Sequence, residues 1–291
     1  MRRGIFRGCA AILALLLLFA IGATAFAWFQ ARQTPAGPPV YVALGSSFAA
    51  GPGLGELQEN SPLLCARSTN GYPRQLARLL KLPIADMSCG GATTAHLLHG
   101  GQFFQGPQVR VINRETRLVT ITVGGNDVGY VGDIQMLAAS RSDGLFGWLV
   151  ATFWNGPEAA NQRDYARFER DLTSLLRAIR RRAPAAKLVV ASYPAILPPS
   201  GSCARILLTS AEVDLMREVG DRLAAATRSA AEKGGALMVD MNASGREHHG
   251  CSADPWTKGQ TPLSEAPFHP TERGARATAR MIVQALDHQQ L

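Results

Sequence analysis

The sequence contains little cysteine, and the cysteines it has are not arranged for metal binding. Five occur in 291 residues, with no paired C-x-x-C spacing. This argues against a zinc site, because structural zinc sites usually take ligands from such pairs. His248 and His249 lie near Asp254, but adjacent histidines rarely bind the same ion. We therefore predict neither a metal nor a cofactor.

Positive charge is present but is nowhere concentrated. The formal net charge of +8 falls to +5 when Arg2, Arg3 and Arg7, which precede an apolar run, are set aside. The densest cluster, residues 180–182, ends a predicted helix, where basic side chains complement the helix dipole. The glycine-rich loop 51–55 lacks the third glycine and the ribose-binding acid of a dinucleotide site. We therefore predict no nucleic-acid partner and no dinucleotide.

An apolar run fills residues 10–29, behind an arginine-rich start. This pattern is typical of an export signal, and a run of about 20 residues can also cross a bilayer. Residues 1–29 are therefore a cleaved signal peptide or a membrane anchor, followed by a linker at 30–38 and a folded domain at 39–291. Because basic residues before the run stay in the cytoplasm, the domain is expected outside it, secreted, periplasmic or anchored.

The remaining cysteines agree with an oxidising compartment. Setting aside Cys9, which precedes the apolar run, leaves an even set of four. Three connectivities can join them, and we favour Cys65–Cys89 with Cys203–Cys251. Each disulfide would contribute roughly 3 to 4 kcal/mol in the chain-entropy model.

Short aliphatic runs alternate with amphipathic stretches along the rest of the chain. Strands are predicted at 40–45, 83–88, 117–123, 187–193 and 236–241. Helices are predicted at 163–182, 210–233 and 271–287. Alternation of this kind predicts an α/β fold with a parallel sheet and helices on both faces.

Residues 131–160 depart from this alternation, because 145–154 is almost wholly apolar. One interpretation is a helix packed on the core. The other is an apolar rim beside a site for acyl chains or a lipid surface. Membrane contact is therefore expected, if anywhere, through residues 8–29 or 145–154.

Chemically useful residues lie where the predicted elements end. Ser47 follows the first strand, Gly91 follows the second, Asn126 follows the third, and His269 precedes the last helix. The carboxyl ends of parallel strands meet at one edge of a sheet, so we expect these residues to lie together. His269 would activate Ser47, because a serine hydroxyl attacks poorly unless a base takes its proton. Asn126 and the N–H groups of Ser47 and Gly91 would hold an oxyanion. Gly-x-Ser spacing selects Ser47 over Ser46.

This ordered set resembles the SGNH hydrolases, also called GDSL esterases and lipases, from about residue 40 to 287. Ser47, Gly91, Asn126 and His269 match that family's four signature residues. Segments 65–68, 72–73, 124–129 and 251–256 resemble its secreted actinomycete-type branch. The resemblance implies a three-layer α/β/α flavodoxin-like fold with about five central strands. It also implies hydrolysis of small-molecule or lipid acyl esters through an acyl-enzyme.

Two positions differ from the family's pattern. The usual Gly-Asp-Ser reads Gly45-Ser46-Ser47, and the triad acid, three residues before the histidine, is Ala266. We therefore expect a Ser-His dyad, with the Ala266 carbonyl holding Nδ1–H of His269. Glu265, one residue out of register, is the competing acid.

Two other functions are weighed against ester or lipid hydrolysis. The first is O-deacylation of a cell-envelope polysaccharide, although few aromatic residues flank the site motifs to stack on sugars. The second is a catalytically inactive binding module, favoured slightly by the missing acid. The four retained signature residues oppose it. A monomer is favoured, but the sequence does not fix the oligomeric state.

Overall fold

A computed structural model describes residues 2–33, 38–59 and 61–288, with side chains from residue 12 onward. Helix α1 (Arg2–Ala31) includes the apolar run and extends two residues into the segment predicted as a linker. Residues 34–37 of that linker lie outside the described residues. Within the described part, Ile12–Ala31 is long and apolar enough to cross a membrane.

Five parallel strands form one sheet in the order β2-β1-β3-β4-β5. They are β1 (Tyr41–Gly45), β2 (Ile84–Asp86), β3 (Leu118–Thr122), β4 (Lys187–Ala191) and β5 (Leu237–Val239). This is the strand order of flavodoxin-like sheets. In such sheets ligands bind outside the carboxyl ends of the strands, at the point where the strand order reverses direction. Here that reversal lies between β1 and β3. The predicted α/β/α fold with about five parallel strands is confirmed.

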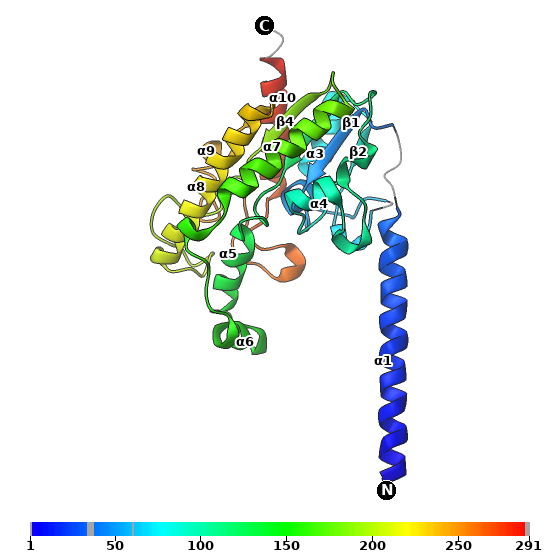
Figure 1. Ribbon diagram of the computed structural model, residues 1–291. Helices are drawn as coiled ribbons and strands as arrows, with labels where there is room; N and C mark the ends of the chain where they lie inside the picture. The colour runs from blue at the N-terminus through cyan, green and yellow to red at the C-terminus, as the bar shows by residue number, and fades with distance from the viewer. Residues whose placement is uncertain (1, 34–37, 60, 289–291) are drawn as a thin grey trace.

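Helices cover both faces of the sheet (Figure 1). The main helices of the domain are α3 (Tyr72–Leu80), α4 (Thr94–His99), α5 (Tyr130–Ala139), α7 (Tyr165–Arg182), α8 (Ser210–Lys233) and α10 (Glu272–Asp287). Alternate strand residues enter two separate cores: Val42 and Ile121 pack with α4, α5, α7 and α8, whereas Ala43 and Val189 pack with α3 and α10. Strands buried on both faces explain why their sequences are continuously apolar.

Several predicted strands are longer than the observed ones. The runs at 83–88 and 187–193 continue into buried turns through Met87 and Ser192. After β5, Asp240 leaves the strand and caps the short helix α9 (Met241–Ser244), because its carboxylate accepts the Ala243 N–H at 3.0 Å. The apolar runs in the sequence are therefore longer than the strands, because residues that follow the strands are buried as well.

Residues 131–160 combine both interpretations of their sequence. Helix α5 buries Ile134 and Leu137 in the core, as a core helix does. Helix α6 (Leu145–Phe153) buries only Gly147 and Val150 and leaves its larger apolar side chains exposed. The core-helix interpretation therefore fits α5, whereas the exposed apolar side chains of α6 fit the interpretation of an apolar rim.

Both favoured disulfides are present. Cys65–Cys89 joins residues 24 apart, and Cys203–Cys251 joins residues 48 apart. The first connects the short 3₁₀ helix η1 (Leu63–Cys65) to the segment that leads from β2 to Gly91. It therefore lies beside the sheet edge at which the candidate site residues meet.

Candidate active site

The chain leaves β1 through a turn that only glycine fits. Gly45 has φ +142°, and a Cβ there would lie 2.3 Å from the Thr122 carbonyl oxygen on β3. The next two serines then take different environments. Ser46 is fully buried, with its hydroxyl 2.6 Å from the hydroxyl of Tyr193. Ser47 begins the four-residue helix α2 (Ser47–Ala50) and remains partly accessible.

His269 lies against Ser47, although 222 residues separate them in the sequence. Its Nε2 is 2.8 Å from Ser47 Oγ. The imidazole is buried, with its ring against that of Phe48. This distance permits direct proton transfer between the hydroxyl and the imidazole.

The group behind His269 differs from the prediction by one residue. Nδ1 lies 2.9 Å from the carbonyl oxygen of Pro267, not that of Ala266. Ala266 and Phe268 both have positive φ, 55° and 61°, which redirects successive carbonyls. The Ala266 carbonyl instead accepts the His269 backbone N–H at 3.3 Å. The Ala266 assignment was therefore wrong.

Glu265, the competing acid, is also not placed to orient the imidazole. It ends the 3₁₀ helix η5 (Leu263–Glu265), and its side chain is exposed. Its main-chain carbonyl accepts a hydrogen bond from Lys258 Nζ. Nδ1 of His269 is paired with Pro267, so the Glu265 assignment is wrong as well.

Gln135 is a neighbour of this site that the sequence did not reveal. Its side-chain amide donates to the same Pro267 carbonyl oxygen at 3.1 Å. A carbonyl oxygen has two lone pairs and can accept both hydrogen bonds. Helix α5, which carries Gln135, thereby holds the acceptor behind His269.

Burial sets the protonation state of His269. Burial, the largest cause, and the nearby Lys258 charge together lower the pKa of the imidazole to about 4, although the Pro267 hydrogen bond opposes the change. The ring is therefore neutral near pH 7 and available as a base. Since Nδ1 faces an acceptor, it carries the proton, and Nε2 presents its lone pair to Ser47.

Candidate oxyanion donors lie on the two turns beside Ser47. Gly91 has φ +77°, a conformation that suits glycine, and is exposed. Among the described residues, neither its N–H nor that of Ser47 donates a backbone hydrogen bond. The exposed Asn126 uses one N–H of its amide for the Ala92 carbonyl at 2.9 Å, which leaves the second available. The three residues that carry the predicted donors follow the carboxyl ends of the neighbouring strands β1, β2 and β3.

The turn that carries Asn126 is fixed on both sides. A Cβ at Gly124 would lie 2.5 Å from the ring of Phe168, and one at Gly125 would lie 2.7 Å from Tyr193. Asp127 accepts the backbone N–H of Thr94 at 3.0 Å and so caps α4. Burial raises the pKa of this carboxyl, and the hydrogen bonds from Thr94 oppose the rise. The role of Asp127 here is therefore to hold the turn after β3 against the turn after Gly91.

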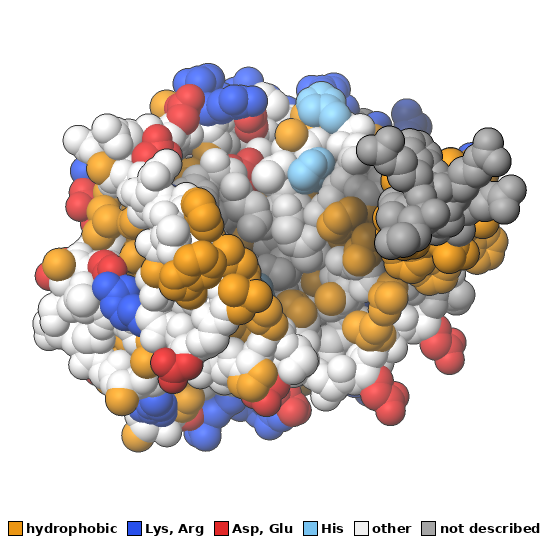
Figure 2. All heavy atoms as spheres, turned by 90° about the horizontal axis from the view of Figure 1, so that it is seen from below, with side chains coloured by type: hydrophobic (Ala, Val, Ile, Leu, Met, Phe, Trp, Pro, Cys, Tyr) orange, Lys and Arg blue, Asp and Glu red, His pale blue; other side chains and the backbone are white. Residues whose placement is uncertain are grey.

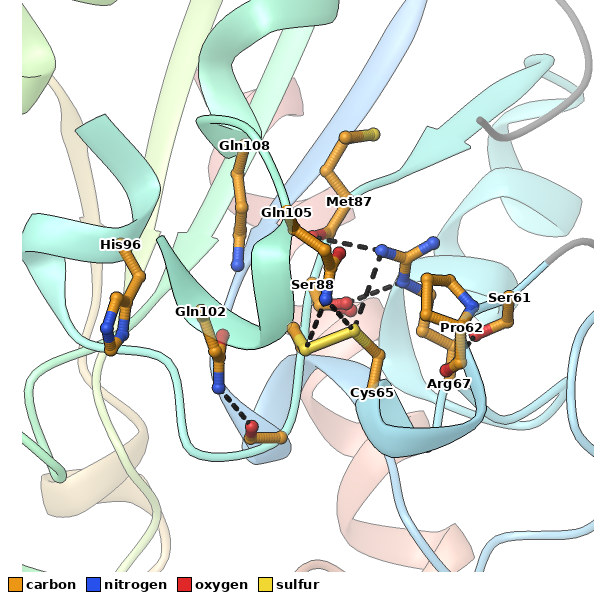
Figure 3. Close-up of a disulfide and its surroundings, with 12 residues drawn as sticks. Ser61, Pro62, Cys65, Arg67, Met87, Ser88, His96, Gln102, Gln105 and Gln108 are labelled. Atoms are coloured by element: carbon orange, nitrogen blue, oxygen red, sulfur yellow. Dashed lines mark hydrogen bonds between the residues drawn. A yellow bond between two sulfur atoms is a disulfide. The ribbon is translucent and has the colours of Figure 1, made fainter. Parts of the chain in front are cut away.

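Three glutamines that the sequence analysis missed hold the neighbouring turns (Figure 3). Gln108 accepts from the Gly45 N–H at 2.9 Å and donates to the Gly45 carbonyl at 3.0 Å. Gln105 Nε2 is 2.9 Å from the Cys65 sulfur, and Gln102 Nε2 donates to the Gly90 carbonyl at 2.6 Å. One segment thus connects the end of β1, the disulfide and the glycine turn.

The candidate metal ligands of the sequence have other partners. His248 stacks on Trp256 with ring centroids 4.2 Å apart, and its Nδ1 lies 2.8 Å from the Asp254 carbonyl oxygen. His249 Nδ1 accepts the Cys251 N–H at 3.2 Å. Within the described residues, no three His, Cys, Asp or Glu side chains are grouped to bind a metal.

The chain matches the model of the GDSL-like Lipase/Acylhydrolase family over residues 43–277. It belongs to this family. The match includes all four candidate residues, from Ser47 to His269. The resemblance inferred from the sequence motifs is thereby confirmed.

Named relatives and solved structures agree with this family assignment. The chain is 32% identical to Lipase 2 of Streptomyces coelicolor over 255 residues, covering 84% of this chain and 85% of that protein. It superposes on an extracellular lipase from Streptomyces rimosus with a TM-score of 0.69 and 29% identity, covering 84% of this chain and 98% of the other. A phospholipase A1 from Streptomyces albidoflavus gives 0.67 and 26%, with coverages of 85% and 98%. This GDSL protein is a serine-dependent carboxylic ester hydrolase of the lipase and esterase type.

Proposed function

We propose that the protein hydrolyses acyl esters with a Ser47–His269 dyad and without a triad carboxylate. The observation that carries this proposal is the line of contacts from Ser47 Oγ to Nε2, at 2.8 Å, and from Nδ1 to the Pro267 carbonyl, at 2.9 Å. A neutral acceptor fixes the tautomer that a general base needs. It does not supply the charge by which an aspartate stabilises the imidazolium.

The reaction proceeds through an acyl-enzyme. Ser47 Oγ attacks the ester carbonyl while Nε2 of His269 takes its proton. The N–H groups of Ser47 and Gly91, with the free N–H of the Asn126 amide, stabilise the tetrahedral oxyanion. His269 then protonates the leaving alkoxide, and water, activated by the same imidazole, hydrolyses the acyl group from Ser47. Every step uses this chain's own residues.

Covalent labelling tests the nucleophile. A fluorophosphonate probe should form a single adduct, on the peptide that contains Ser46 and Ser47, and fragmentation should place it on Ser47. An adduct on Ser46, whose hydroxyl contacts Tyr193, would reverse the assignment. Complete absence of labelling in a folded protein would support the inactive binding module instead.

Glu265→Gln should change kcat by less than about tenfold, roughly 1.4 kcal/mol. The reason is that the Glu265 side chain is exposed, whereas Nδ1 is paired with Pro267. Initial rates on a soluble aryl ester provide the measurement, with Glu247→Gln as a matched exposed control. A thousandfold loss in a folded variant would instead identify Glu265 as a triad acid, because neutralising such an acid costs about 10⁴-fold.

The acid limb of kcat/KM should lie near pH 4. Burial lowers the pKa of His269 to about 4 from an ordinary 6.5, so the neutral, proton-accepting ring persists as the pH falls through 6. Rates should therefore hold from pH 7 to near 5 and then drop. Recovery on return to pH 7 separates titration from unfolding. A limb near 6.5 would mean that the imidazole is more solvated than this site allows.

Polysaccharide O-deacylation uses the same dyad and remains the alternative substrate class. Parallel assays with acetylated sugars and with long-chain acyl esters distinguish the two. Long-chain acyl esters are favoured over acetylated sugars because the relatives are named lipases and a phospholipase.

We further propose that the domain acts outside the cytoplasm. Segment 1–29 is then either a cleaved signal or an anchor that crosses the membrane. Three observations support this location: the apolar helix Ile12–Ala31, the two disulfides and the extracellular lipase among the relatives. Mass measurement of the mature chain decides between cleavage and anchoring.

A further inference from the structure

We infer that two exposed apolar patches rest on the surface of a lipid bilayer and turn Ser47 toward the membrane that α1 crosses. The inference rests on the proposed ester hydrolysis at Ser47 and on segment 1–29 being the anchor, and it names the physical state of the substrate. That substrate is a long-chain acyl ester taken from the bilayer itself.

The first patch, called the α6 patch, consists of large apolar side chains on one short helix. They are Leu145, Phe146, Trp148, Leu149 and Phe153, each 38 to 72% exposed. Only Gly147 and Val150 of α6 are buried. Helix α6 follows α5, and α5 holds the Pro267 carbonyl behind His269 through Gln135. The α6 patch therefore extends from the His269 side of the site.

The second patch, called the η patch, lies on the Gly91 side. It consists of Leu63 and Leu64 from η1 with Phe103 and Phe104 from η2 (Gln102–Phe104), each 41 to 60% exposed. The Gly90 N–H donates to the Cys65 carbonyl at 3.0 Å, and Gln102 donates to the Gly90 carbonyl. The η patch is thus fixed directly to the glycine turn.

The backbone at the η patch is unusual for aromatic residues. Phe103 and Phe104 both have positive φ, 48° and 64°. Bulky side chains rarely adopt this conformation, and where they do it commonly marks a functional site. Here the strained turn leaves two phenyl rings exposed, which folding of the domain alone does not require.

Both patches face the end of the domain from which α1 extends. In Figure 1, α6 and α1 project from the same end of the molecule, and in Figure 2, seen from that end, hydrophobic side chains gather in two groups. A cavity of about 220 Å³ lies between α1 and the η patch, lined by Phe26 and Ala27 on one side and by Leu63, Leu64 and Phe103 on the other. The η patch is therefore continuous with the base of α1.

This continuity favours a bilayer over a second protein as the occupant. The described part of α1 exposes apolar side chains on every face, as a membrane helix does. A bilayer that surrounds α1 must also cover the residues in contact with its base. The single tryptophan of the α6 patch suits the boundary between headgroups and acyl chains. Together, the two patches leave the Ser47 edge facing lipid.

A comparison of two substrates tests the inference on the full chain reconstituted into dioleoylphosphatidylcholine vesicles. One substrate is p-nitrophenyl acetate in solution, and the other is a fluorogenic oleoyl ester in the bilayer. The α6 variant Phe146→Glu/Trp148→Glu and the η variant Phe104→Glu should retain soluble-ester rates within about twofold. Each should lose at least tenfold on the bilayer ester. Leu79→Glu on α3, at a side chain 52% exposed, is the control and should change neither rate.

The result is the ratio of the rate on the bilayer ester to the rate on the soluble ester. Partial unfolding lowers both rates by the same factor, so a partly unfolded variant still gives a valid ratio. If the double variant loses all activity, Phe153→Ser at the exposed end of α6 gives the same ratio with less disturbance. An unchanged ratio in every variant overturns the inference. A rise in the soluble rate alone also overturns it, because α6 would then be a lid over Ser47. A wild-type protein inert toward both esters contradicts the proposed function itself.

Discussion

Ser47→Ala is expected to lower ester hydrolysis by about 10⁴- to 10⁶-fold. Loss of a serine nucleophile costs about this much, because no acyl-enzyme forms and the histidine base then has no hydroxyl to activate. The measurement is kcat/KM on a soluble aryl ester, with the fold checked by thermal unfolding. Nε2 of His269 contacts Ser47 and not Ser46, which is why the effect belongs to this serine.

Ser46→Ala is the matched control and should retain most of the activity. Its hydroxyl is buried against Tyr193, so the variant loses about 1 kcal/mol of stability through one broken hydrogen bond. Equal losses in the two variants would mean that Ser46 acts in catalysis and would contradict the dyad.

Asn126→Ala should lower kcat by about 10²- to 10³-fold, equivalent to 2.7–4 kcal/mol of transition-state stabilisation. One N–H of this amide donates to the Ala92 carbonyl, and the other remains for the oxyanion. Because the oxyanion exists only in the transition state, KM should change little. Steady-state kinetics on the same soluble ester separates kcat from KM.

Asn113→Ala, at an exposed asparagine in the loop that precedes β3, should leave both constants unchanged. If Asn126→Ala raises KM and spares kcat, the amide binds substrate and does not stabilise the oxyanion. The backbone donors of Ser47 and Gly91 would then act alone.

Much of the fold was predictable because its signals are local. Five aliphatic runs separated by amphipathic stretches specify a parallel sheet, and the parallel sheet brings Ser47, Gly91 and Asn126 to one edge. The motifs around these residues also identified the family.

The remaining features depend on tertiary contacts that leave no pattern in the sequence. The one-residue error at Ala266 arose because positive φ at Ala266 and Phe268 follows from packing, with Phe268 wholly buried. The glutamines at 102, 105, 108 and 135 act through contacts to main-chain groups or to a disulfide sulfur, and their positions in the sequence do not indicate these partners. The sequence left two interpretations open for the segment that forms helix α6, because a helix that is apolar on every side has the same pattern whether it faces a core or lies exposed.

The acceptor behind His269 also has a genetic consequence. Because that acceptor is the main-chain oxygen of Pro267, no substitution at this position removes the atom itself. What a substitution can remove is the path of the chain, set by the left-handed residues on either side. The partner of the proposed general base is therefore kept by the conformation of the backbone, and a search of aligned sequences for an acid three residues before the histidine, at Ala266, will not reveal it.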